Sequence, residues 1–553
     1  MKAVEISIHN FRSICDANIR FENCGVLVGT NNAGKTTVID SIRAFYGKGV
    51  KFNPDKDFPH IGMEDDECWV EIEFLPTQEE LENLKEEYQS ESSTFRVRNY
   101  LYSKVKDKEG KDRSGPYAYI NGVLSEDRFY GFKNVAQSKF GQIIYIPAVS
   151  KVDEHTKLTG PSALRDLLTV VLSKVMAGSE AYKGLNDSFQ QFEEAIKSEA
   201  TEDGFSLETI EQDISSELEQ WEADFILNIN PIGVDDLLKG LVSHQIIDKA
   251  LETPQSISSY GQGFQRSVIY TLIRIAAKYS STKSPKKKKE FSPDLTWILF
   301  EEPEAFLHPT QISILNAELR AWCQTESSQV LLSTHNPLLA THSIQNLPAI
   351  CRLQRINSQT SAYQINQTDL DQILAVNQLD AQKWADSGLQ ISADDLLLDM
   401  EAVKYALWLD SKRCAAFFSE KVLMVEGPSE TALLSYMYDE GLLPGCKGVF
   451  FLDTIGKYNM HRFMRLFEVY GIKHYVLFDE DNGRNQIVSD TIRESSNTFT
   501  GGIDSFESDI EGFLGIPNAG RPHRKPQHIM YRISQDNVKL EPLAEKIEAL
   551  VGR

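Results

Sequence analysis

Carboxylate side chains follow two apolar runs in the last quarter of the sequence. Glu426 and Glu430 come after the run VLMV, and Asp479 and Asp481 come after the run HYVLF. Glu426 and Glu430 are four residues apart and can share one face of a helix. Asp479 and Asp481 are two residues apart at a strand end, so their side chains project to the same side while that of Glu480 points elsewhere. Since acids at the carboxyl ends of parallel strands meet in one crevice, we predict a site for Mg²⁺ or Mn²⁺ here.

A phosphate-binding loop is the second chemical signal. Residues 29–36, GTNNAGKT, fit the pattern G-x-x-x-x-G-K-[ST] between an apolar strand and a helix. Lys35 would reach the outer phosphates of ATP, and the Thr36 hydroxyl would ligate Mg²⁺. The residues expected to contact the nucleotide are Gly29, Asn31, Asn32, Gly34, Lys35, Thr36 and Thr37.

Acids for nucleotide hydrolysis are expected at the end of another buried strand. The apolar run WILF leads directly into Glu301 and Glu302. Glu301 would support the metal ion, and Glu302 would polarise the attacking water. His335 ends a further apolar run, VLLSTH, where it would sense the outer phosphate; a lone histidine is more often structural, so the order of the motifs carries this prediction.

Strand and helix patterns place these motifs in an α/β fold. We predict an ATPase core in residues 1–154 and 246–375, interrupted by a helical insertion at 155–245. A helical linker is expected at 376–418, and a second α/β domain at 419–553. The acids and the phosphate-binding loop therefore belong to different domains of one chain.

Charge and composition exclude several classes of protein. The 80 acidic and 57 basic residues give a net charge of −23, so any contact with nucleic acid must be local. No apolar stretch is long enough to cross a membrane, and the start lacks the pattern of a signal peptide. No cysteines are paired at the spacing of a zinc site, so we expect reduced thiols in a cytoplasmic protein.

The order of the motifs resembles ABC-type ATPases of the SMC/RecF branch. The wording EEPEAFLHP is particularly similar to the OLD (overcoming lysogenisation defect) nucleases, and the two acidic strand ends resemble a Toprim domain. The resemblance implies an ABC-type P-loop ATPase head with a helical insertion, followed by a C-terminal α/β Toprim domain. Glu301 stands where many ABC proteins carry Asp.

The resemblance also implies a homodimer or higher oligomer, with the helical insertion as its dimerisation element. In such ATPases two heads face each other, so that a segment with Ser259 and Gly261 would cap the nucleotide held by Lys35 of the other chain. This segment, SSYGQG, departs from the usual L-S-G-G-Q wording through Tyr260.

In OLD-type sites further acids hold a second metal ion and a lysine stabilises the reacting phosphate. Here Asp509 and Glu511 are preferred to Glu507 as ligands, and Lys525 would be the cation, although a surface lysine is equally consistent. Lys457 would touch DNA phosphate or belong to a plain turn that caps a helix.

The resulting hypothesis is an ATP-regulated, metal-dependent DNA endonuclease that acts in phage defence. It would act alone, with a helicase subunit, or with a retron reverse transcriptase and its RNA–DNA hybrid. One alternative is a DNA-tethering or repair ATPase of the SMC/RecF kind whose Toprim domain is a non-catalytic platform. Another is a nucleotide-sensing scaffold that recruits a basic protein.

Overall fold

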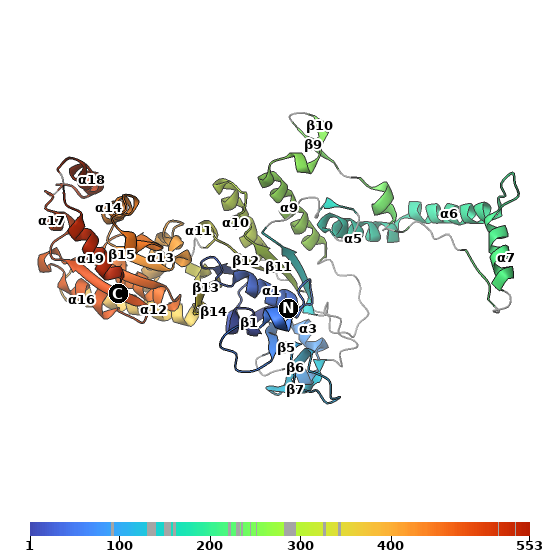
Figure 1. Ribbon diagram of the computed structural model, residues 1–553, viewed down its shortest axis with the longest axis horizontal. Helices are drawn as coiled ribbons and strands as arrows, with labels where there is room; N and C mark the ends of the chain where they lie inside the picture. The colour runs from blue at the N-terminus through green and yellow to red at the C-terminus, as the bar shows by residue number, and fades with distance from the viewer. Residues whose placement is uncertain are drawn as a thin grey trace. The chain divides into compact units, whose positions relative to one another are not determined.

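The computed structural model of the protein divides the chain into two compact units, residues 1–148 with 288–553, and residues 149–287. Figure 1 shows the secondary structure along the chain. The structure describes residues 1–89, 93–129, 140–148, 156–158, 162–218, 223–227, 233, 236–243, 245–249, 252–280, 295–323, 328–340, 344–517, 519–536 and 538–552.

Among the described residues, the first unit contains three sheets. The first is antiparallel, in the order β2 (Ile14–Arg20), β1 (Lys2–Phe11), β4 (Cys68–Leu75), β5 (Phe95–Tyr102), β6 (Gly115–Ile120) and β7 (Val123–Arg128). The second has the order β14 (Gln359–Gln364), β13 (Ile350–Ile356), β3 (Cys24–Val28), β12 (Ser328–Ser333), β11 (Thr296–Glu301) and β8 (Gln142–Ile146). It is parallel except for β14, and β11 is buried along its whole length, as its unbroken apolar run predicts.

Helix α1 (Lys35–Phe45) lies between these two sheets. It contacts β1, β4 and β5 of the antiparallel sheet and β12 of the parallel sheet. Nine of its eleven residues are buried, and Ile39 and Ile42 are fully so. The helix that follows the phosphate-binding loop is thus fixed on two sides, which holds its first residue, Lys35, in place.

The third sheet is parallel, in the order β16 (Val449–Asp453), β15 (Lys421–Val425), β17 (Lys473–Asp479) and β18 (Thr500–Phe506). One apolar core joins Leu423 and Leu477 to residues of α14 (Pro428–Asp439) and α19 (Glu541–Val551). The helix α15 (Met460–Val469) also contacts β17. The predicted α/β class is confirmed, and the carboxyl ends of β15 and β17 lie side by side.

This unit also contains further α-helices between and after the strands. They are α2 (Pro54–Asp57), α3 (Gln78–Asn83), α10 (Pro309–Cys323), α11 (Pro337–Ala340), α12 (Gln367–Asp386), α13 (Leu398–Trp408), α16 (Gln486–Glu494), α17 (Ile510–Leu514) and α18 (Lys525–Gln535). No described helix is both long and apolar enough to cross a membrane.

A buried ion pair fastens the connecting helices to the C-terminal sheet. Glu401 of α13 receives two hydrogen bonds from Arg462 of α15, at 2.6 and 2.8 Å, and both side chains are buried. Burial opposes the charge of Glu401, but Arg462 and Lys404 still hold its pKa below the usual value. Trp384 of α12 adds a hydrogen bond to Thr491 of α16.

Arg352 on β13 connects the second sheet to the C-terminal sheet. Its buried guanidinium donates hydrogen bonds to the carbonyl oxygens of Phe417, Ser419, Tyr470 and Gly471, at 2.9–3.2 Å. Burial lowers the pKa of Arg352 to about 10, which leaves it charged at neutral pH. Four carbonyl groups in two main-chain segments therefore accept hydrogen bonds from one cation.

The second unit is largely helical. Its elements are α5 (Ala163–Gly178), α6 (Glu180–Ser198), α7 (Leu207–Leu218), a π-helical turn (Leu237–Leu241), β9 (Ile246–Asp248), β10 (Thr253–Gln255) and α9 (Gln262–Ser280). Helix α5 packs against α9, and β9 pairs with β10 as an antiparallel hairpin. The unit includes residues 246–287, which the sequence analysis grouped with the ATPase core.

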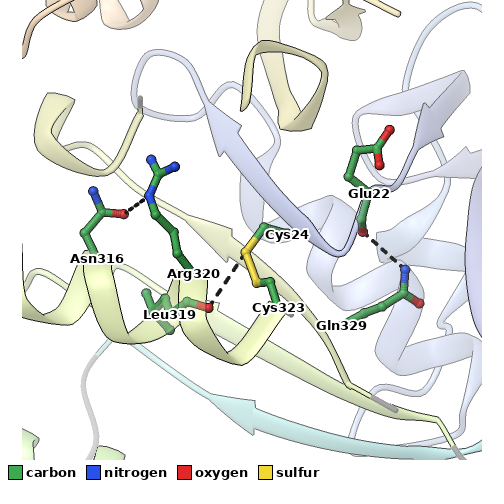
Figure 2. Close-up of a disulfide and its surroundings, with 7 residues drawn as sticks. All are labelled: Glu22, Cys24, Asn316, Leu319, Arg320, Cys323 and Gln329. Atoms are coloured by element: carbon green, nitrogen blue, oxygen red, sulfur yellow. Dashed lines mark hydrogen bonds between the residues drawn. A yellow bond between two sulfur atoms is a disulfide. The ribbon is translucent and has the colours of Figure 1, made fainter. Parts of the chain in front are cut away.

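The expectation of reduced thiols throughout is wrong at one place. Cys24, the first residue of β3, forms a disulfide with Cys323, the last residue of α10 (Figure 2). The two lie 299 residues apart, so no local spacing indicates the bond; packing of α10 beside the parallel sheet brings them together. The five other cysteines are free: Cys15, Cys68, Cys351, Cys414 and Cys446.

We predict that Arg352→Met lowers the free energy of unfolding by about 3 kcal/mol, because four buried carbonyl groups lose their donor. Urea denaturation of the whole chain measures this change. Arg355→Met on the same strand is the matched control, because Arg355 is exposed; its effect should stay within about 0.5 kcal/mol. An equal decrease in the two variants would show that the Arg352 hydrogen bonds contribute nothing special.

Candidate functional site

The phosphate-binding loop turns sharply at two glycines. Gly29 has φ +137° and Gly34 has φ +105°, which are conformations that other residues rarely adopt. A Cβ atom on Gly29 would meet the Leu353 carbonyl oxygen at 2.1 Å, and one on Gly34 would meet the Thr360 hydroxyl at 2.6 Å. Both positions therefore require glycine, as the sequence motif predicts.

Lys35 lies against this loop. Its ammonium donates hydrogen bonds to the carbonyl oxygens of Gly29 and Thr30, at 3.0 and 2.9 Å. Burial lowers the pKa of Lys35 to about 8, and Glu302 and Glu304 oppose that shift. Phosphate oxygens are stronger acceptors for this ammonium than carbonyl groups are. Asn31, Asn32 and Thr36 are exposed along the loop, and Thr37 is buried.

Glu301 is the last residue of β11, and one of its carboxylate oxygens is available to a metal ion. Its Oε2 accepts a hydrogen bond from the Tyr145 hydroxyl at 2.9 Å, whereas its buried Oε1 has no hydrogen-bond partner among the described residues. The Arg43 guanidinium stacks on the Tyr145 ring at 3.7 Å. Because nothing in the sequence marked it, sequence reasoning missed Tyr145, whose role follows from the pairing of β8 with β11.

Glu302 and His335 lie close together beyond the ends of β11 and β12. Glu302 has a strained left-handed φ of 44°, and its carboxylate oxygen lies 3.6 Å from His335 Nε2. Burial, together with the charge of Lys35, lowers the pKa of His335, so the ring is neutral at pH 7. A neutral imidazole can still donate one hydrogen bond to a phosphate.

Glu304 is a residue that the sequence reasoning missed. Its Oε1 accepts hydrogen bonds from the Thr334 hydroxyl and the His335 backbone N–H, both at 2.8 Å. It thereby ties the turn after β11 to the end of β12. Glu304 is visible in the sequence as the third acid of EEPE. Its contacts with Thr334 and His335, which follow β12, could not be predicted from the sequence.

Ser259 and Gly261 belong to the second compact unit. Both are exposed immediately before α9, and the Ser259 hydroxyl donates a hydrogen bond to the Ser256 carbonyl oxygen at 2.6 Å. Gln265 fixes the turn by donating to the carbonyl oxygens of Ser258 and Tyr260. Their contact with nucleotide across a dimer remains a prediction.

The carboxylate site begins with a direct contact between two strand ends. Glu426 follows β15, and its Oε1 accepts a hydrogen bond from the backbone N–H of Asp479 at 2.8 Å. Glu430 accepts a hydrogen bond from the Gly427 N–H at 3.0 Å and so caps the start of α14. Glu480 is turned away and pairs with Arg493, as predicted, but a turn is the cause and not strand alternation, because β17 ends at Asp479 and Asp481 has a left-handed φ of 52°.

The electrostatics of the site are those of crowded, buried acids. Burial raises the pKa of Asp479 to about 9, and the nearby carboxylates of Glu426 and Glu430 add to the shift. Burial likewise raises the pKa of Glu426 to about 7, with contributions from Glu430 and Asp481. Each charge that forms here makes the next one costlier.

Lys457 supplies positive charge beneath these acids. Its side chain is 3% exposed, and its ammonium donates a hydrogen bond to the Asp479 carbonyl oxygen at 2.5 Å. The same ammonium lies 3.6 Å from an Asp481 carboxylate oxygen. Lys457 therefore contacts the acidic strand end inside the domain. Its burial argues against the contact with DNA phosphate that the sequence suggested.

The third acidic cluster adjoins the first two. Asp509 caps α17 by accepting a hydrogen bond from the Gly512 N–H at 2.8 Å. Glu511 is buried, and its Oε2 lies 2.7 Å from the Lys525 ammonium. Asp479 contributes to the charge environment of Lys525, and Asp509 to that of Asp479. Glu507 is exposed, which supports the preference for the other two.

The site is suited to hard cations but is not a finished metal cage. Within the described residues, no three His, Cys, Asp or Glu side chains are grouped closely enough to hold a metal ion as they stand. The donor set is all carboxylate, and buried Oε1 of Glu511 has no hydrogen-bond partner there. Oxygen ligands of this kind fit Mg²⁺ or Mn²⁺, whose charge would offset the repulsion.

Two family models match the chain. "Overcoming lysogenization defect protein-like, TOPRIM domain" matches residues 417–481, which contain Glu426, Glu430, Asp479 and Asp481. "AAA domain, putative AbiEii toxin, Type IV TA system" matches residues 25–341, more than half of the chain, and this range contains the phosphate-binding loop and the acids after β11.

Two curated proteins are similar over most of their length. The Old nuclease of Escherichia phage P2 is 23% identical over 528 residues, which is 92% of this chain and 83% of that protein. Endonuclease GajA of Bacillus cereus strain VD045 is 24% identical over 499 residues, 87% of this chain and 75% of that protein. Among solved structures, the SMC head domain of Thermotoga maritima aligns with a TM-score of 0.33 at 13% identity, over 66% of this chain and all of that one.

The raised pKa of Asp479 predicts how the metal-free protein responds to pH. The folded state binds this proton more tightly than the unfolded state does, so stability falls as pH rises from about 4 towards about 9. We expect Asp479→Asn to raise the melting temperature in EDTA by several degrees at pH 8 and by much less at pH 5.

Thermal unfolding at several pH values measures this difference. Asp439→Asn is the control because Asp439 is exposed at the end of α14. A wild-type protein whose stability rises between pH 5 and 8 relative to Asp479→Asn would contradict the pKa assignment. Added Mn²⁺ should stabilise the wild type more than the variant, since the cation binds the ionised carboxylate.

The loop geometry predicts that Lys35→Ala weakens ATP binding at least about tenfold, since the variant cannot donate a charge-assisted hydrogen bond to phosphate. Titration of a fluorescent ATP analogue measures the change. Lys48→Ala, an exposed lysine shortly after α1, should bind as the wild type does. Unchanged affinity in Lys35→Ala would remove residues 29–36 as the nucleotide site.

Proposed function

Since the chain belongs to the OLD family of ATPase–Toprim nucleases, we propose that it is an ATP-regulated, metal-dependent DNA endonuclease. The observation that carries the proposal is the crowding of acids at the ends of β15 and β17. Glu426 accepts a hydrogen bond from the Asp479 backbone N–H, and burial together with the Glu426 and Glu430 carboxylates raises the pKa of Asp479. Carboxylates with raised pKa values cluster at catalytic and metal-binding sites.

In this proposal the acids divide into two ligand groups. Glu426, Asp479 and Asp481 would hold one cation, and Glu430, Asp509 and Glu511 would hold a second. Together the two cations would activate a water molecule and neutralise the leaving oxygen of the phosphodiester.

The chain's own cations complete the chemistry. Lys457, bonded to the Asp479 carbonyl oxygen, fixes the end of β17 so that its side chain keeps its direction. Lys525 pairs with Glu511 and would shift to the extra negative charge that the phosphate gains during attack. Water oxygen bonds to phosphorus, one ester P–O bond breaks, and the departing oxygen takes up a proton.

ATP binding at the first site would regulate this cleavage. Lys35 and Thr36 would hold the phosphates and Mg²⁺, with Glu301 supporting the metal ion, Glu302 polarising water and His335 sensing the outer phosphate. The exposed segment with Ser259 and Gly261 would cap the nucleotide of a second copy, which makes a homodimer the working form.

The biological setting proposed is defence against phage in the cytoplasm. The chain would act alone, with a helicase subunit, or with a retron reverse transcriptase and its RNA–DNA hybrid. A DNA-tethering ATPase with a non-catalytic Toprim domain is the competing function; the complete set of acids favours the nuclease.

We expect the purified protein to nick or linearise supercoiled plasmid in Mg²⁺ or Mn²⁺, and Asp479→Ala to lower the rate at least about a thousandfold while it still binds ATP. Agarose gels with and without ATP measure cleavage and the sign of regulation. Lys35→Ala should cut DNA at a rate that no longer responds to ATP.

Asp439→Ala, at an exposed acid of the same domain, is the matched control and should cut at the wild-type rate. If neither cation supports cleavage, and Asp479→Ala binds DNA and ATP as the wild type does, the tethering function replaces the nuclease. Loss of ATP binding in Asp479→Ala would mean that the substitution harms the fold, and Asp479→Asn would then replace it.

A further inference from the structure

An unusually basic segment adjoins the carboxylate site. Between Glu511 and Asp536 the sequence contains no acidic residue, although the whole chain carries 80 acids in 553 residues. The cations of this stretch are Arg521, His523, Arg524, Lys525, His528 and Arg532. We call the part from Arg521 to His528 the basic segment. Within residues 419–553 the stretch between Glu511 and Asp536 is the longest without an acidic residue.

The fold holds the basic segment close to the proposed metal ligands. Lys525, its central residue, lies 2.7 Å from Glu511. Helix α18, which begins at Lys525, packs against α14, the helix that carries Glu430. Ile529 on α18 is fully buried in the core beneath the sheet. The segment therefore cannot move away from the acids without exposing that core.

The turn before α18 is also ordered by its own hydrogen bonds. The Arg524 backbone N–H donates to the Arg521 carbonyl oxygen at 3.0 Å. The His528 ring and the Pro517 carbonyl oxygen are 2.8 Å apart. These contacts use the main chain and one ring, and they leave both arginine side chains at the surface.

Arg521 and Arg524 differ from most other arginines of this domain, although Arg484 is likewise exposed and without an ion pair among the described residues. Arg462, Arg465 and Arg493 each form an ion pair with a carboxylate. Arg521 and Arg524 are exposed, and neither forms an ion pair within the described part of the chain. Two exposed guanidinium groups without an ion pair among the described residues are free to bind an external anion.

We propose that Arg521 and Arg524 bind the phosphate backbone of duplex DNA beside the phosphodiester that is cut. The inference rests on the proposed nuclease function and names the surface by which that site takes its substrate. A guanidinium group binds phosphate through two parallel hydrogen bonds, and such contacts position DNA without reading its sequence. Local attraction here offsets the long-range repulsion between DNA and an acidic protein.

DNA binding as a function of salt concentration tests this proposal. Binding is measured on the Asp479→Ala background, so that cleavage does not interfere, with fluorescent duplexes of unrelated sequence. Arg521→Ala and Arg524→Ala should each weaken binding about tenfold for every sequence. Each should also reduce the slope of log affinity against log salt by about 0.9, because one fewer DNA phosphate is neutralised by the protein.

Two further variants separate a charge effect from a fold effect. Lys447→Ala removes an exposed cation at the opposite, amino-terminal edge of the same sheet, and should change neither affinity nor slope. Arg524→Lys keeps the charge but not the paired hydrogen bonds, so it should keep the slope and lose part of the affinity. Melting temperatures check that each variant is folded.

Cleavage assays distinguish failure of this inference from failure of the proposed function. In an otherwise wild-type chain, the arginine variants should need more DNA for half-maximal rate while the rate at saturation changes less than about twofold. If the wild type cuts DNA but the arginine variants bind with unchanged affinity and slope, the inference is wrong and the nuclease stands. The same binding assay is run with RNA duplexes. If the arginine variants bind RNA more weakly but DNA as the wild type does, the surface binds a different nucleic acid and the inference is also wrong.

Discussion

Repulsion between buried carboxylates is the constraint on which the C-terminal domain depends. Asp479 lies at the end of β17 with Glu426 and Glu430 beside it, and burial raises its pKa to about 9. Such a cluster lowers the stability of the metal-free fold, because each buried acid destabilises the folded state when it ionises. Lys457, which contacts the Asp479 carbonyl oxygen, and Lys525, which pairs with Glu511, offset part of the negative charge. The remainder explains why divalent cations are the natural ligands of this edge of the sheet.

The nucleotide site and the carboxylate site are parts of one continuous framework. Strand β13 pairs directly with β3, which enters the phosphate-binding loop, and Arg352 pairs in register with Val28 at that junction. From the other end of its side chain, Arg352 holds the turn at Tyr470 and Gly471 that leads into β17 and so to Asp479. A shift of β3 on nucleotide binding thus has a physical route to the acids, which is what regulation by ATP requires.

Residue patterns in the sequence predicted the motif residues, but not the residues that contact them in the fold. The glycines of the loop, Lys35, and the acids after β11, β15 and β17 could be predicted because strand ends and backbone turns leave local signals. Tyr145, Glu304 and the interior role of Lys457 could not, since each depends on which strands become neighbours. The Cys24–Cys323 disulfide could not be predicted for the same reason, as its two residues are 299 positions apart.

Counting bound Mn²⁺ by electron paramagnetic resonance tests the central claim most directly. The Lys35→Ala protein without nucleotide leaves only the C-terminal site to be filled. The account predicts two Mn²⁺ ions per chain, and none or one after a further Asp479→Asn substitution. Equal numbers of bound ions with and without Asp479→Asn would contradict it, because the crowded carboxylates would then not be metal ligands.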